Sequence, residues 1–121
     1  MRLRSDIWVD AYRRRCEKLG GFVTLRRRGA SEAGAIFLCV SGPDRLLDLY
    51  GPAPQTAYAH AGMSRKFHRL NREPWTALDL EPYLDKQLRF DPDLWLLDID
   101  DNRKRHFLMD DELYREPVLS D

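Results

Sequence analysis

The chain has 121 residues, of which 43% are apolar and 33% are charged, which is enough for the core of a single domain. Its 20 basic residues balance its 20 acidic ones, so the composition does not favour a general polyanion binder. Seven glycines and seven prolines are too few for collagen or a Pro/Gly-rich disordered chain, and no apolar run is long enough to span a membrane.

The first predicted element is a helix. Apolar residues recur at helical spacing between residues 6 and 19, with charged residues on the other side. Ser5 is a suitable N-cap, and Gly20 and Gly21 can end the helix because glycine readily adopts the left-handed conformation found there. The side expected to face the core is formed by Ile7, Trp8, Ala11, Tyr12, Cys16 and Leu19.

Three strands are predicted after this helix, at residues 22–28, 35–40 and 45–50. They are rich in large apolar and β-branched residues, and turns containing glycine or proline separate them. Their close succession along the chain favours an antiparallel meander. Residues 66–71 are a candidate fourth strand.

A second helix is predicted over residues 79–90, where apolar residues again follow helical spacing. A strand with alternating apolar residues follows at 94–100, and residues 105–109 can return as its hairpin partner. Phe90 and Trp95, which flank the break between helix and strand, are both expected to enter the core.

Runs of strands with helices set apart are typical of the α+β class. We therefore predict a two-layer α+β domain over residues 1–109, with a mainly antiparallel sheet of four or five strands and two helices on one face. Residues 110–121 are predicted to form a polar C-terminal tail. Cys16 and Cys39 lie in apolar stretches and are expected to be buried thiols. The first residues lack a signal-peptide pattern, so we expect a cytoplasmic protein.

The zero net charge hides a division along the chain. Residues 1–28 carry nine basic and three acidic side chains, whereas residues 73–101 carry nine acidic and two basic ones. If the first helix packs beside the end of the first strand, the basic side chains can form one patch suited to RNA, DNA or an acidic protein. The candidate binding residues of this patch are Arg13, Arg14, Arg26, Arg27 and Arg28.

The loop from Tyr50 to Gln55 is the second candidate binding feature. Two prolines make it stiff and extended, and Tyr50 and Gln55 add one aromatic ring and one amide. A stiff loop binds a partner chain at low entropic cost. The alternative is a rigid wall that closes the edge of the sheet, a place where proline is common.

Patterns that would indicate catalysis are weak. The three histidines are far apart and have no ligand at metal-site spacing, and the sequence lacks a glycine-rich phosphate loop, so we expect neither a metal nor another cofactor. Asp91 and Asp93 flank a turn and are the only carboxylates that we consider for an enzyme hypothesis.

Four phrases of the sequence carry a family resemblance. They are Asp6–Val9, Arg27–Ala35, Tyr50–Gln55 and Phe90–Trp95, in this order. The chain resembles, over roughly residues 1–108, a conserved alphaproteobacterial family known as a domain of unknown function. The resemblance implies no activity, cofactor or catalytic residue.

These observations favour a small non-enzymatic binding module with a protein partner or a second copy of itself, since the oppositely charged segments can pair between or within copies. The alternative is RNA or DNA binding through the N-terminal arginine clusters. An enzyme that uses Asp91 and Asp93 is the third hypothesis.

Overall fold

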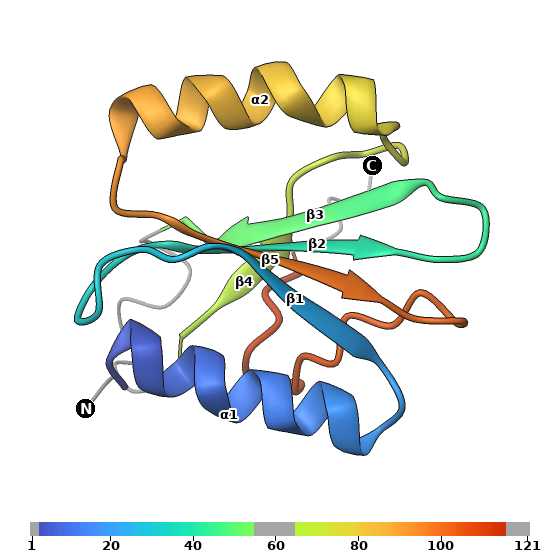
Figure 1. Cartoon of the computed structure of the whole chain (residues 1–121), viewed down its shortest axis with the longest axis horizontal. Coiled ribbons are helices and arrows are strands. Elements are labelled where there is room, and N and C mark those ends of the chain that lie inside the picture. The colour runs from blue at the N-terminus through green and yellow to red at the C-terminus, as the bar shows by residue number, and fades with distance from the viewer. Residues whose placement is uncertain (1–2, 55–64, 116–121) are drawn as a thin grey trace, which may run out of the picture.

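The computed structural model describes residues 3–54 and 65–115 and shows a five-stranded sheet between two helices (Figure 1). The elements in chain order are α1 (Ser5–Lys18), β1 (Phe22–Arg27), β2 (Ile36–Ser41), β3 (Leu47–Pro52), β4 (Phe67–Arg69), α2 (Ala77–Phe90) and β5 (Trp95–Asp100). The α+β class and the mainly antiparallel five-stranded sheet that the sequence predicts are confirmed.

The order of strands in the sheet is β1-β5-β2-β3-β4. The last strand, β5, lies between β1 and β2, antiparallel to β1 and parallel to β2. The expected meander is therefore correct for β2, β3 and β4 but wrong for β1, which pairs only with β5 among the described residues. Short turn signals between predicted strands cannot show that a later strand is inserted between them.

The two helices cover opposite faces of the sheet, so the predicted two-layer arrangement with both helices on one face is wrong (Figure 1). The physical reason is that β2 and β5 are apolar on both faces. Ile36 and Leu38 pack in the cluster under α1, whereas Phe37 and Cys39 pack in the cluster under α2. A strand with two apolar faces must be covered on both.

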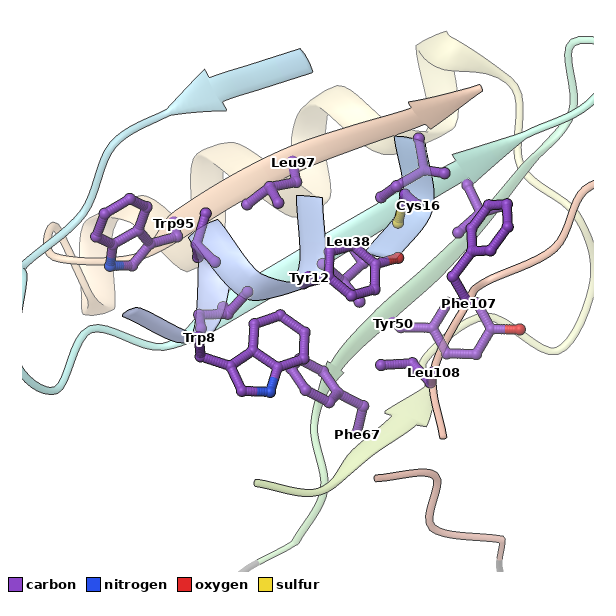
Figure 2. Close-up of a cluster of buried hydrophobic side chains, with 14 residues drawn as sticks. Trp8, Tyr12, Cys16, Leu38, Tyr50, Phe67, Trp95, Leu97, Phe107 and Leu108 are labelled. Carbon is purple, nitrogen blue, oxygen red and sulfur yellow. The ribbon is translucent and has the colours of Figure 1, made fainter. Parts of the chain in front are cut away.

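The α1 face of the sheet holds the larger cluster, which Figure 2 shows with Trp95 at one end and Phe107 at the other. The buried side of α1 is rotated relative to the expected one. Val9 is buried, whereas Ile7, Ala11 and Leu19, which were expected to face the core, are exposed. Buried residues of α1 are Ser5, Trp8, Val9, Tyr12 and Cys16.

Ser5 accounts for this rotation of α1. It is the first helical residue rather than the N-cap, and its buried hydroxyl donates to the Gly34 carbonyl at 2.6 Å. The N–H groups of Ser5 and Asp6 donate to the carbonyls of Glu32 and Ser31. The connection between β1 and β2 thus satisfies the helix N-terminus that a side-chain cap would otherwise serve.

Helix α2 begins two residues before the predicted start, because Thr76 and Asp79 form a capping box. Its last residue, Phe90, is exposed rather than buried, so that expectation is wrong, whereas Trp95 enters the core as expected. Leu80 and Leu84 are the buried residues of α2.

We expect Leu97→Ala to lower the free energy of unfolding by about 2–5 kcal/mol, because Leu97 is 0% exposed in the central strand β5. Leu78→Ala is the matched control, since Leu78 is 85% exposed on α2 and its truncation should change stability by less than about 0.5 kcal/mol. Urea denaturation followed by circular dichroism measures both. Equal effects of the two substitutions would contradict the placement of the core.

Candidate functional site

The three consecutive arginines at the end of β1 point to different partners. Arg26 Nη2 lies 2.7 Å from a carboxylate oxygen of Glu81 on α2. Arg27 donates to the Pro92 carbonyl at 2.6 Å, and the Arg28 guanidinium lies 5.0 Å from the centre of the Trp95 ring. These guanidiniums are already engaged within the chain.

Arg13 and Arg14 lie on α1, where they border a shallow hollow together with Asp10 and Glu17. Because Arg26 pairs with α2, which covers the opposite face of the sheet, the structure does not gather the five arginines into one patch.

The two candidate catalytic carboxylates belong to the turn after α2. Asp91 is the C-cap of α2, and its carboxylate accepts a hydrogen bond from the Asp93 N–H at 3.1 Å. The Asp93 carbonyl accepts from the Ala30 N–H. The role that the structure gives to Asp91 and Asp93 is to shape this turn.

The second candidate binding feature is the loop from Tyr50 to Gln55. Tyr50 lies in β3, while Gln55 lies outside the described residues.

Tyr50 borders a hollow of the surface that has a volume of about 600 Å³. Its lining contains three guanidinium groups, two imidazoles and two phenols, and no carboxylate. We call it the basic hollow. The lining residues are Tyr50, His68, Arg69, Leu70, Arg72, His106, Leu113, Tyr114 and Arg115.

Two walls of the basic hollow come from strand pairing. Tyr50 on β3 is the register partner of Arg69 on β4, so their side chains start from neighbouring backbone positions. On the other side of β4, the Phe67 N–H donates to the Glu112 carbonyl and the Tyr114 N–H donates to the Phe67 carbonyl, both at 2.7 Å. This pairing brings Tyr114 and the next residue, Arg115, to the rim.

Glu112 fixes this C-terminal segment to α1. Its side chain is buried and accepts hydrogen bonds from Trp8 Nε1 at 3.0 Å, from Arg15 at 2.7 Å and from the Met109 N–H at 2.9 Å. Arg15 also donates to the Phe107 carbonyl at 2.8 Å. Helix α1 therefore holds the segment that forms the second wall.

A tight turn after β5 places His106. The buried carboxylate of Asp101 accepts from the Arg105 side chain through Nε and Nη2, each at 2.9 Å, and from the Arg103 and Arg105 N–H groups. These bonds, with the Arg105 side chain first, lower the pKa of Asp101 to about 2. Lys104 and Phe107 adopt positive φ angles of 56° and 59° on either side of this stretch, a conformation that few side chains adopt without such support.

The neutral groups of the basic hollow are hydrogen-bond donors. The ring of His106 meets that of Tyr50 edge-on at 5.2 Å, and its Nδ1 accepts from the Leu108 N–H at 2.9 Å, which leaves Nε2 to carry the proton. Burial, and then the charge of Arg115, lowers the pKa of His106. Burial raises the pKa of Tyr50. Both rings are therefore neutral at neutral pH.

The positive charge of the basic hollow comes from its arginines. Arg69 lies 2.8 Å from a carboxylate oxygen of Asp48, which is also 3.6 Å from Lys104 Nζ. In contrast, no hydrogen bond or ion pair joins Arg72 or Arg115 to any residue within 3–54 and 65–115. Two guanidiniums from separate segments thus face one hollow without a counterion from these residues.

Sequence reasoning found Tyr50 on β3 but missed the other lining residues, because they come from the region of β4 and the segment after β5. The one local signal is the basic stretch from His68 to Arg72, which contains three of the lining charges and rings. Within the described residues, no group of three or more His, Cys, Asp and Glu side chains is placed to hold a metal ion.

The architecture is that of a small α+β domain whose mixed sheet is covered by one helix on each face. The chain belongs to the family described as "Protein of unknown function (DUF1491)", whose model matches residues 3–109, and the family resemblance seen in the sequence is thereby confirmed. None of the curated proteins compared with it matches. Neither helix in the described part of the chain is long and apolar enough to cross a membrane.

Solved structures with the same fold come from alphaproteobacteria. A crystal structure of a DUF1491 family protein from Caulobacter crescentus CB15 is 32% identical, with a TM-score of 0.76, over 95% of this chain and 100% of that one. The solution structure of protein Atu0922 from A. tumefaciens is 33% identical, with a TM-score of 0.78, over 97% of this chain and 98% of that one.

We expect Asp101→Asn to destabilise the protein at neutral pH by on the order of 1–2 kcal/mol. The folded-state pKa of Asp101 lies below its unfolded value, so its contribution is present above the unfolded value and is lost as the pH falls towards about 2. The stability difference between the two proteins should therefore shrink from about pH 5 downward. A difference that stays constant over this range in denaturant titrations would rule out the charged contact as its source.

Glu112→Gln should lower the free energy of unfolding by about 2–3 kcal/mol, because it leaves the half-buried Arg15 guanidinium without a carboxylate. Glu17→Gln, an exposed change on the same helix, is the control and should stay within about 0.5 kcal/mol. Guanidinium chloride denaturation measures both. If both changes have the same small effect, Glu112 does not anchor the C-terminal segment.

Proposed function

We propose that the protein is a binding module and that the basic hollow holds the anionic group of its ligand. The observation that carries this proposal is the pair of guanidiniums, Arg72 and Arg115, which face one hollow and have no described counterion. The chain as a whole has no net charge, so this local excess of positive charge is a property of the site and not of the composition.

The chemistry of the lining suits an oxyanion. A guanidinium offers a planar fork of N–H donors that matches the oxygens of phosphate or carboxylate groups. Arg72 lies after β4 and Arg115 lies after the segment held by Glu112, so one anion between them would receive donors from two sides. The His106 imidazole adds a neutral donor to the same hollow.

The alternative binding hypotheses have less support. The ion pair between Arg26 and Glu81 joins the basic and acidic segments inside one chain, which removes part of the reason for pairing between copies. Nucleic-acid binding through the N-terminal arginines needs a shared surface, and Arg13 and Arg14 lie on the other face of the sheet from the Arg26 contact.

A cytoplasmic location fits this proposal. The two cysteines, Cys16 and Cys39, are free and buried, and they belong to clusters on opposite faces of the sheet. Free thiols are the usual state in a reducing compartment.

Titration of the ¹⁵N-labelled protein with sodium sulfate at low ionic strength tests the site. We expect saturable shifts of the Arg72, His106 and Tyr114 amides, which weaken as sodium chloride is added. Arg72→Ala/Arg115→Ala should reduce the affinity by about tenfold or more, since each charge-assisted hydrogen bond is worth about 1.5–3 kcal/mol.

Arg13→Ala/Arg14→Ala is the matched control, because it removes two arginines from the outer side of α1. It should bind sulfate like the unmodified protein. Equal losses in the two double variants would reduce the effect to general charge and overturn the proposed site, as would shifts that avoid the basic hollow.

A further inference from the structure

We infer that the ligand of the basic hollow is a nucleotide, with its phosphate between Arg72 and Arg115 and its base against the aromatic rings of the lining. This inference rests on the proposed function and adds the class of ligand. Three features of the hollow carry it: its size, its rings and the state of the neighbouring strand edge.

The volume of the basic hollow is too large for an oxyanion alone. About 600 Å³ lies within the range of roughly 300–1,000 Å³ that organic ligands occupy. A single water takes about 30 Å³, so a tetrahedral anion would leave most of this space to solvent. The ligand therefore has a substantial part besides its charged group.

The lining indicates that this part is a flat ring. Four of the nine lining residues, Tyr50, His68, His106 and Tyr114, carry rings, and Leu70 and Leu113 add apolar contacts. The His106 ring stands edge-on to the nearly buried Tyr50, which fixes one wall. His68 on β4 and Tyr114 on the segment beside it are half-buried, so each residue keeps part of its surface exposed at the hollow.

Rings and guanidiniums together are the combination that proteins use for nucleotides, because bases stack on aromatic faces while arginines hold the phosphates. An aliphatic anion would use the guanidiniums and leave the rings without a role.

An extended acidic peptide fits this site less well. Peptides that bind beside a sheet usually add a strand to a free edge. Here the outer edge of β4 is occupied at Phe67, which forms backbone hydrogen bonds with Glu112 and Tyr114. The part of this edge at Phe67 is therefore closed to an added peptide strand, and the rest of the hollow is lined by side chains.

A nucleotide can come from two sources, as a free mononucleotide or as one residue of a single strand. The test titrates the full chain with inorganic phosphate, ribose 5-phosphate, uridine 5′-monophosphate and a short oligouridylate, followed by ¹⁵N spectra. We expect the uridine compounds to bind about tenfold or more tightly than ribose 5-phosphate, since stacking of one base contributes about 1–3 kcal/mol.

Variants of Tyr114 separate the base contact from the phosphate contact. Its backbone N–H bond to Phe67 does not depend on the side chain, so substitution keeps the second wall in place. Tyr114→Leu should weaken uridine 5′-monophosphate about tenfold and leave inorganic phosphate unchanged, whereas Tyr114→Phe keeps the ring and should bind both normally.

The outcomes separate this inference from the proposed function. If uridine 5′-monophosphate binds no more tightly than ribose 5-phosphate, or if Tyr114→Leu weakens both equally, the nucleotide assignment is overturned while anion binding stands. If none of the four probes binds, both are overturned. Tighter binding of the oligouridylate than of the mononucleotide indicates a single strand as the source. In that case the logarithm of the affinity should fall with the logarithm of the salt concentration by about 0.7 for each phosphate contacted. Equal affinities indicate a free nucleotide.

Discussion

The buried carboxylate of Glu112 is the contact on which the second wall of the basic hollow depends. It joins the indole of Trp8, the guanidinium of Arg15 and the backbone of Met109, so one side chain ties α1 to the segment after β5. Burying an ion pair costs hydration that its attraction largely offsets, so the pair adds little net stability, whereas removing one partner leaves the other charge buried and is destabilising. Two further hydrogen bonds, from the Tyr12 hydroxyl to the His106 carbonyl and from Arg15 to the Phe107 carbonyl, hold the earlier part of the same segment to α1.

The fold could be predicted from the sequence wherever periodicity is local. The alternating apolar residues of β5 and the helical spacing of α2 correctly indicate a strand and a helix. Topology could not be predicted in this way, because the pairing of β5 with both β1 and β2 is decided by apolar surfaces on two faces of the central strands. The continuous apolar run Ile36–Val40 was the signal that both faces are covered, since alternation is lost in a strand buried on both sides.

The site was harder to predict than the fold. Arginines close together in the sequence find separate partners within the chain, since Arg26 pairs with Glu81 on α2 whereas Arg28, just after β1, lies over the Trp95 ring. Arg72 and Arg115, which line the same hollow, are separated by more than forty residues in the sequence. They share this surface because the segment around Glu112 and Tyr114 pairs with β4. Local density of charge therefore says little about a binding surface until the pairing of distant segments is known.

The position of β5 between β1 and β2 has a consequence for how the chain is made. On the ribosome β1 emerges some seventy residues before its only described neighbour, so it has no ladder partner until β5 has been made. Such distant pairing is slow, and an unpaired strand invites association with other chains. The run of positive charge at the end of β1 opposes that association, because charge on an unpaired strand discourages pairing with other chains, which gives these arginines a protective part during biogenesis.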